Sequence, residues 1–77
     1  MPRYFFHIKD KAKTMLDQEG IELDDLNEVR KKATQGANRI MREQVRLGRP
    51  RDDQLFVVTD EHGQTVLTFP FKLAIRD

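Results

Sequence analysis

The start of the chain alternates short hydrophobic runs with polar turns. Residues 4–8 form an aromatic and β-branched run that ends at charged residues 9–11, so the pattern predicts a strand over residues 3–9. Residues 14–16 predict a weaker second strand. Residues 17–20 then form a turn, with Asp at its first position and Gly where a positive φ is wanted. Together the two strands predict a hairpin.

The middle of the chain predicts one long helix, over residues 26–47. Asp25 is placed as its N-cap, with Glu28 three residues later as in a capping box, and Gly48 suits the left-handed conformation that ends many helices. Small residues at the centre of its apolar stripe predict a close approach to a sheet. The apolar and small positions, which fall on one stripe, are Leu26, Val29, Ala33, Gly36, Ala37, Ile40, Met41 and Leu47.

The last third of the chain predicts a second hairpin. Residues 54–59 and 65–71 are rich in Val, Phe, Leu and Thr, and residues 60–63 between them read as a turn that ends in Gly. Residues 72–77 form a tail or one helical turn. We therefore expect a single α+β domain over residues 1–77. Its ββαββ order gives a four-stranded, mainly antiparallel sheet with one helix on one face, in the spatial order 2-1-3-4, with 2-1-4-3 less favoured.

Large apolar side chains fall on both faces of the predicted sheet. A sheet with one exposed face normally alternates apolar and polar residues, and these strands do not alternate cleanly. One helix can cover only one face, so the other face is expected to be buried by a further element or a partner. The candidate interface residues are Phe5, His7, Lys9, Phe56 and Val58.

Two alternatives remain open for that second face. Tyr4 and Phe6 could be the exposed set of the first strand in place of its odd-numbered residues. The cover could be a second copy of the chain, or the C-terminal tail folded back through Phe71, Leu73 and Ile75. A homodimer or a small protein partner is the favoured expectation, because a chain of 77 residues is near the size where one core is only just sufficient.

Charge is distributed unevenly along a chain whose formal net charge is +1. Residues 30–51 carry eight basic residues and one acid, whereas the segments on both sides are net acidic. Such a face can bind phosphates, but a charged outer face is also the usual solvated side of a helix. The candidate anion-binding residues, all predicted opposite the apolar stripe, are Lys31, Lys32, Arg39, Arg42 and Arg46.

The composition gives little support to catalysis or to a bound cofactor. The chain contains no cysteine, serine or tryptophan, so thiolate metal sites and the two commonest nucleophiles are excluded. His7 could be a base, a metal ligand or a pH-sensitive residue, but a histidine making one ordinary hydrogen bond is the simpler interpretation. His62 lies in the turn over residues 60–63, and a structural turn is a simpler interpretation of these residues than a metal-binding site. We expect no enzyme activity, metal or cofactor.

The start of the chain lacks the pattern of a secretory signal, and no apolar run approaches the length of a membrane span. We therefore expect a cytoplasmic protein without membrane contact.

Several motifs resemble those of a family of small proteobacterial domains of unknown function. They are the opening Met-Pro-Arg-Tyr-Phe-Phe-His of residues 1–7, the acidic segment 17–26, the turn 58–63 and Thr68-x-Pro70-Phe71. The resemblance covers nearly the whole chain and implies a compact two-hairpin domain with one central helix. It implies no catalytic or binding residues.

In topology the chain is also similar to the antitoxin half of bacterial toxin and antitoxin pairs, although such antitoxins usually carry a separate DNA-binding segment and this chain has none. The expected function is a small non-enzymatic protein-interaction or regulatory module that self-associates. The alternative is a nucleic-acid-binding protein that uses the basic helix face.

Overall fold

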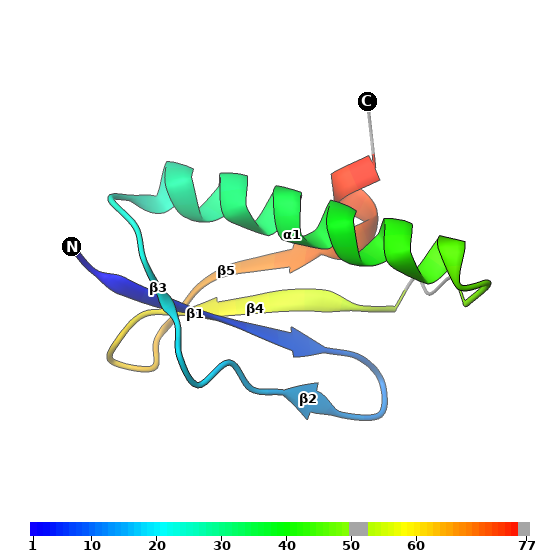
Figure 1. Cartoon of the computed structure of the whole chain (residues 1–77). Coiled ribbons are helices and arrows are strands. Elements are labelled where there is room, and N and C mark those ends of the chain that lie inside the picture. Colours follow the sequence, from blue (N-terminus) through cyan, green and yellow to red (C-terminus); the bar gives the residue numbers. More distant parts are fainter. Residues whose placement is uncertain (50–52, 76–77) are drawn as a thin grey trace.

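The structure, a computed structural model, describes residues 1–49 and 53–75. It consists of one layer of strands with a long helix across one face (Figure 1). The predicted α+β class, the single long helix and both hairpins are confirmed. In chain order the elements are β1 (Arg3–Lys9), β2 (Thr14–Met15), β3 (Ile21–Glu22), α1 (Leu26–Arg46), β4 (Leu55–Thr59), β5 (Thr65–Pro70) and the 3-10 helix η1 (Phe71–Ile75).

The sheet has the order β2-β1-β4-β5, and all neighbouring strands are antiparallel. It corresponds to the predicted order 2-1-3-4, because β4 and β5 are the third and fourth predicted strands. The described residues contain a fifth strand that was not predicted, because β3 pairs with the start of β1 through Arg3↔Glu22 and Tyr4↔Ile21. A strand of two residues is too short to produce an alternating pattern, so β3 could not be predicted from the pattern of apolar and polar residues.

Helix α1 begins and ends within one residue of the predicted bounds. The Asp25 carboxylate accepts a hydrogen bond from the Glu28 N–H at 3.0 Å, as expected of an N-cap. Gly48 follows the helix with a φ of +74°. Ala33 and Ala37 are fully buried, and a Cβ atom at Gly36 would lie 3.3 Å from Cζ of Phe56. The small residues therefore allow the helix to lie close to β4.

Replacing Gly36 by leucine tests this close approach. Gly36→Leu is expected to lower the free energy of unfolding by about 1–3 kcal/mol, because the new side chain overpacks the contact with Phe56. This holds although a leucine gains about 1 kcal/mol of helix propensity over glycine. Urea denaturation measures the change, with Gln35→Leu on the exposed side of the same turn as the control. An equal or smaller loss in Gly36→Leu than in Gln35→Leu would contradict the packing argument.

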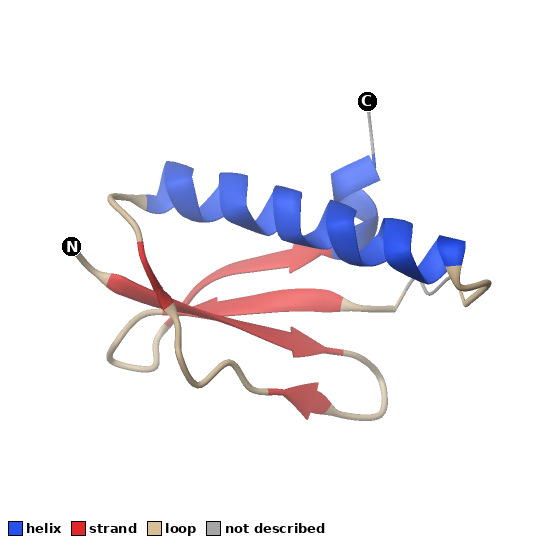
Figure 2. Ribbon diagram, in the orientation of Figure 1, coloured by secondary structure: helices blue, strands red, loops and turns tan. Residues whose placement is uncertain are grey.

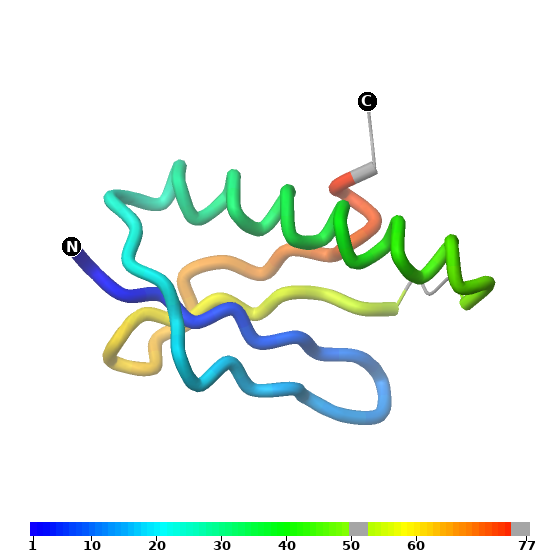
Figure 3. The backbone as a smooth tube through the Cα atoms, in the orientation of Figure 1, coloured from blue at the N-terminus to red at the C-terminus, as the bar shows by residue number. Residues whose placement is uncertain are grey.

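The C-terminal segment packs on the same side of the sheet as α1. Phe71 is 1% exposed, and its ring centroid lies 4.7 Å from that of Phe56. The Asn38 side-chain amide donates to the Ala74 carbonyl at 3.2 Å, which ties η1 to α1 (Figure 3). The alternative in which Phe71 and Leu73 fold back over the second sheet face is therefore wrong, because Phe71 fills the space beside the helix instead.

Candidate functional site

One face of the sheet has no helix over it in the part of the chain that the structure describes (Figure 2). Side chains alternate between faces along a strand and pair with neighbours on the same face, so the register decides which residues lie there. His7 pairs with Val57, and Val57 pairs with Thr68. We call this surface the open face; its residues are Phe5, His7 and Lys9 of β1, Leu55, Val57 and Thr59 of β4, and Thr68 of β5.

The predicted interface is partly corrected by this register. Phe56 and Val58 are 5% and 0% exposed and lie in the core beneath α1, so their assignment to the interface is wrong. They pair with Ile8 and Phe6, and the alternation of β1 directs those residues toward the helix. Phe6 belongs to the same helix-covered face, so the alternative that exposed it is also wrong.

Leu55 and Val57 take the places on the open face that the sequence assigned to Phe56 and Val58. Both strands carry large apolar residues at odd and even positions, so alternation alone could not choose between the two sets. A shift of one residue in the pairing exchanges the faces completely, and only the register with β1 resolves it.

Phe5 packs over a glycine at one end of the open face. A Cβ atom at Gly20 would lie 2.8 Å from Cε2 of Phe5 and 2.9 Å from Cγ of Arg3. The Phe5 and His7 rings are stacked, with centroids 6.4 Å apart and planes inclined by 6°. Gly20, whose φ is +69°, therefore gives Phe5 its position on the sheet.

The Asp17 carboxylate fills a gap between β2 and β3 along the edge of β1. One oxygen accepts from the Phe6 N–H at 3.0 Å, and the other accepts from the Glu19 and Gly20 N–H groups, each at 3.1 Å. Burial raises the pKa of Asp17, but these three N–H groups and the nearby His7 ring outweigh it, and the pKa lies below its usual value. Asp17 thus replaces a missing strand residue as the partner of β1.

His7 is held in one tautomer by its neighbours. The Asp17 N–H donates to Nδ1 of His7 at 3.0 Å, so Nδ1 of the neutral ring carries no proton. Nε2 then carries the proton and donates to the Thr59 hydroxyl oxygen at 3.1 Å. A base that activated Thr59 would need the lone pair on Nε2, which this arrangement does not leave free. The His7 ring therefore makes two hydrogen bonds, one more than the simpler interpretation of its sequence position expects, and these hold it in place on the open face.

Both edges of the sheet are obstructed among the described residues. On one side β2 covers two residues, and the Asp17 carboxylate already takes the Phe6 N–H. On the other side of the sheet, the Phe71 N–H donates to the Gln54 carbonyl at 3.0 Å and so points inward. The N–H groups of successive strand residues point to opposite sides, so the outer edge at the preceding residue is the nitrogen of Pro70, which carries no hydrogen. The register of β5 against β4 also shifts near Thr59. Short strands, prolines and bulges are the means by which sheet edges avoid pairing.

A shallow hollow of about 360 Å³ lies toward the Lys9 end of the open face. Leu55, Val57 and Thr68 contribute to its lining, with Lys9 and Lys11 at the same end. The hollow and the Phe5 ring therefore lie toward opposite ends of the same face, since Phe5 pairs with Thr59 and Lys9 pairs with Leu55.

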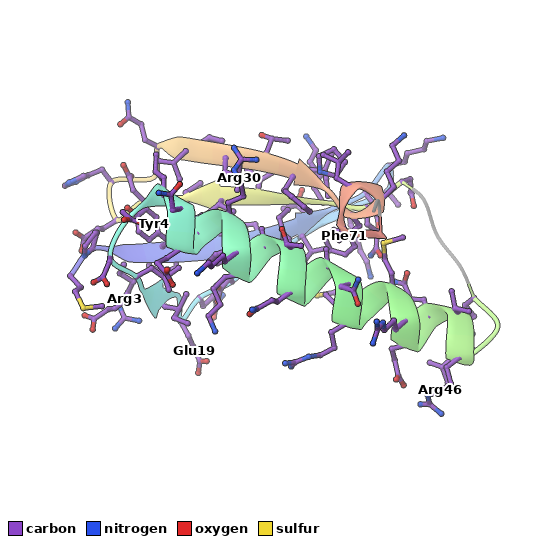
Figure 4. All side chains as sticks on the ribbon, turned by 90° about the horizontal axis from the view of Figure 1, so that it is seen from above. Arg3, Tyr4, Glu19, Arg30, Arg46 and Phe71 are labelled. Carbon is purple, nitrogen blue, oxygen red and sulfur yellow. The ribbon has the colours of Figure 1, made fainter. Side chains whose placement is uncertain are left out.

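The five candidate anion-binding residues are all exposed on α1. Figure 4 shows one of them, Arg46, at the end of the helix. Lys31 forms an ion pair with Glu28 at 3.7 Å, and Arg46 pairs with Glu43. Within the described residues, no ion pair with a carboxylate and no side-chain hydrogen bond is formed by Lys32, Arg39 or Arg42.

His62 lies in the predicted turn. The Asp60 carboxylate accepts from the His62 and Gln64 N–H groups, each at 2.9 Å, and Gly63 has a φ of +80°. The Gln64 N–H is the main group that lowers the pKa of Asp60, against a smaller opposing effect of desolvation. Residues 1–49 and 53–75 contain no group of three or more histidines and acids that could hold a metal. None of their helices combines the length and apolarity that crossing a bilayer requires.

A comparison with protein-family models places most of the chain in a known family. The family model described as "Domain of unknown function (DUF6894)" matches residues 3–72. No curated protein and no solved structure matches the chain.

Proposed function

We propose that this chain, which belongs to the DUF6894 family of domains of unknown function, is a non-enzymatic protein-binding module that self-associates through its open face. The observation that supports this best is that α1 and η1 lie on one face of the sheet, while Phe5, Leu55 and Val57 stay partly exposed on the other. A chain of 77 residues buries a small core, and association commonly completes the burial in domains of this size.

Association through the face is favoured over association through an edge. An edge-to-edge dimer needs a row of free backbone N–H and C=O groups, and Pro70, the shifted register of β5 and the Asp17 carboxylate interrupt both rows. Packing of two sheets face to face uses the side chains that project between them, and Phe5, Leu55 and Val57 provide apolar ones on the open face.

The charges at the two ends of the sheet make a second copy the fitting partner. Lys9, Lys11 and Lys13 lie at one end, whereas Glu19 and Glu61 lie at the other. A two-fold axis perpendicular to the strands places the basic end of one copy against the acidic end of the other, twice.

Other charged side chains at these ends interact within the chain. At the basic end, the Asp10 carboxylate accepts from the Ala12 and Lys13 N–H groups and the Asp53 carboxylate accepts from the Lys11 N–H, so these two acids reduce the positive charge without cancelling that of the three lysines. At the acidic end, Arg3 pairs with Glu22 at 3.7 Å. The same two-fold arrangement brings the Phe5 ring of one copy toward the hollow beside Leu55 of the other.

Sedimentation equilibrium tests the proposal. The protein is expected to have twice its chain mass of 9.1 kDa at micromolar concentration. Thr68→Lys adds a charge to an exposed position midway along β5, on the open face beside Val57, so it is expected to shift the protein to a monomer while far-UV circular dichroism stays unchanged. Gln35→Lys adds the same charge on the outer side of α1 and is expected to leave the dimer intact.

A chain that remains monomeric at high micromolar concentration would refute self-association. A dimer that Thr68→Lys and Gln35→Lys weaken equally would refute the open face as its interface.

A further inference from the structure

We infer that the outer side of α1 binds the phosphate backbone of double-stranded nucleic acid without reading its base sequence. This is a second surface, on the opposite side of the molecule from the open face, so both surfaces can be occupied at once. We call it the basic stripe; its residues are Lys31, Lys32, Arg39, Arg42 and Arg46.

The basic stripe is a band of cations that runs along one side of α1 and covers about 100° of its circumference, at 3.6 residues per turn. Val29, Ala33 and Ala37 bury the opposite side of α1 against the sheet, which fixes the direction in which the stripe points. The stripe extends over about 22 Å from Lys31 to Arg46, at about 1.5 Å of rise per residue. The sheet therefore presents the stripe to solvent along most of the helix.

The pairing of these cations separates the stripe from an ordinary solvated helix face. Exposed helix cations can form i,i+3 or i,i+4 pairs with acids, as Lys31 does with Glu28 and Arg46 does with Glu43. Glu28 also lies four residues before Lys32, and Glu43 lies four residues after Arg39, but within the described residues neither acid pairs with these two cations. Arg42 likewise has no ion pair there. Their charges are available to a ligand.

The helix dipole does not account for these cations either. Its effect is confined to the last turn of a helix, where Arg46 is the basic residue. Arg39 and Arg42 lie before that turn, so their positions give them little benefit from the helix end.

The side chains around the cations identify the class of ligand. Helix α1 contains no aromatic residue, so the stripe has no platform on which single-stranded bases could stack. Its apolar side faces the sheet, so the helix cannot insert that side into a lipid surface. A duplex, which presents a regular row of phosphates and keeps its bases stacked, matches a row of unpaired cations.

The net charge of the chain supports a local contact. Residues 30–51 carry a formal charge of +7 in a chain of net charge +1, so the rest of the protein is acidic. An acidic remainder repels phosphates and leaves the stripe as the contact surface.

Fluorescence anisotropy with labelled mixed-sequence DNA and RNA duplexes tests the inference. With about three phosphate contacts the logarithm of affinity should fall with a slope of about −2.7 against the logarithm of salt concentration, which is about a 40-fold loss between 50 and 200 mM salt. The affinity should not depend on base sequence, and a single strand of the same length should bind more weakly.

A pair of matched variants separates the stripe from net charge. Arg39→Gln with Arg42→Gln is expected to reduce the magnitude of the slope by about 1.8. For a comparison at equal charge, Arg39→Gln alone should reduce the slope by about 0.9. Lys72→Gln removes the same charge from the exposed side of η1, outside both proposed surfaces, and is expected to leave the slope unchanged. The substituted positions are all exposed, and circular dichroism checks that each variant is folded.

Three results would overturn the inference. The first is no anisotropy change with either duplex at low salt, and the second is an equal loss of slope in Arg39→Gln and Lys72→Gln. The third is binding to vesicles of anionic lipid without binding to a duplex. None of these results bears on self-association, which the measured mass tests separately.

Discussion

Gly20→Ala is expected to lower the free energy of unfolding by about 2–5 kcal/mol. Gly20 has a φ of +69°, and an L-residue in this conformation costs about 1–2 kcal/mol. The added Cβ atom would also lie 2.8 Å from the Phe5 ring and 2.9 Å from Cγ of Arg3, and overpacking of this kind costs about 1–3 kcal/mol. Urea denaturation at a fixed protein concentration measures the sum.

Gly63→Ala is the matched control because it isolates the backbone contribution. Gly63 has a φ of +80°, and a Cβ atom there would meet nothing within 4 Å. The control should therefore lose only the conformational part, about 1–2 kcal/mol. Equal losses in the two variants would show that the contact between Gly20 and Phe5 contributes nothing to stability.

The same substitution connects stability with the proposed function. Phe5 lies on the open face and its ring rests on Gly20, so a displaced ring changes the surface that a second copy would contact. Gly20→Ala is therefore also expected to weaken self-association, whereas Gly63→Ala, in the turn between β4 and β5, should not.

Local signals in the sequence predicted most of the fold. The two ends of the helix were predicted correctly from Asp25 and Gly48, because capping depends only on residues within one turn of each end. The turns at residues 17–20 and 60–63 were predicted for the same reason, since an aspartate that accepts from N–H groups two to four residues ahead is a local arrangement.

Features that depend on pairing between distant strands could not be predicted. The exchange of Phe56 and Val58 for Leu55 and Val57 on the open face follows from the register of β4 against β1, which is a contact across about 50 residues of sequence. The strand β3 has the same origin, because Ile21 and Glu22 are extended only where β1 is available to pair with them. The basic stripe was predictable because a helical repeat is local.

Asp17 shows the limit of the local argument most clearly. The sequence predicted the carboxylate oxygen that accepts from Glu19 and Gly20, as the first residue of a turn. The other oxygen accepts from Phe6, eleven residues earlier, and the main-chain N–H of Asp17 holds His7. No sequence pattern records these two contacts, yet they order the open face.

The two proposed surfaces differ in the physical forces that they use. The open face relies on apolar burial and should keep its partner as salt increases, because burial of apolar surface is not screened. The basic stripe relies on displaced counterions and should lose its ligand over the same range of salt. Salt concentration therefore separates the two activities in one protein.

Asp17→Ala is expected to lower the free energy of unfolding by about 2–3 kcal/mol at neutral pH. The substitution removes the acceptor of three N–H groups, and hydrogen bonds to a charged group contribute about 1.5–3 kcal/mol each when buried, less where water can replace them. The Phe6 N–H then has no partner at the edge of β1. Asp24→Ala, in an exposed segment, removes the same charge and is expected to change stability by less than about 0.5 kcal/mol.

The loss should depend on pH with a definite sign. The pKa of Asp17 is lower in the folded protein than its ordinary value of about 3.9, so its contribution is present above that value and disappears as the pH falls through the folded pKa. The stabilities of the wild-type protein and Asp17→Ala should therefore converge in acid.

Asp17→Asn separates charge from geometry. It keeps an oxygen for Glu19 and Gly20 but places an NH₂ group against the Phe6 N–H, so its loss should be intermediate and should lack this titration. A constant difference between the wild-type protein and Asp17→Ala from neutral pH into acid would show that the carboxylate charge does not stabilise the edge of β1.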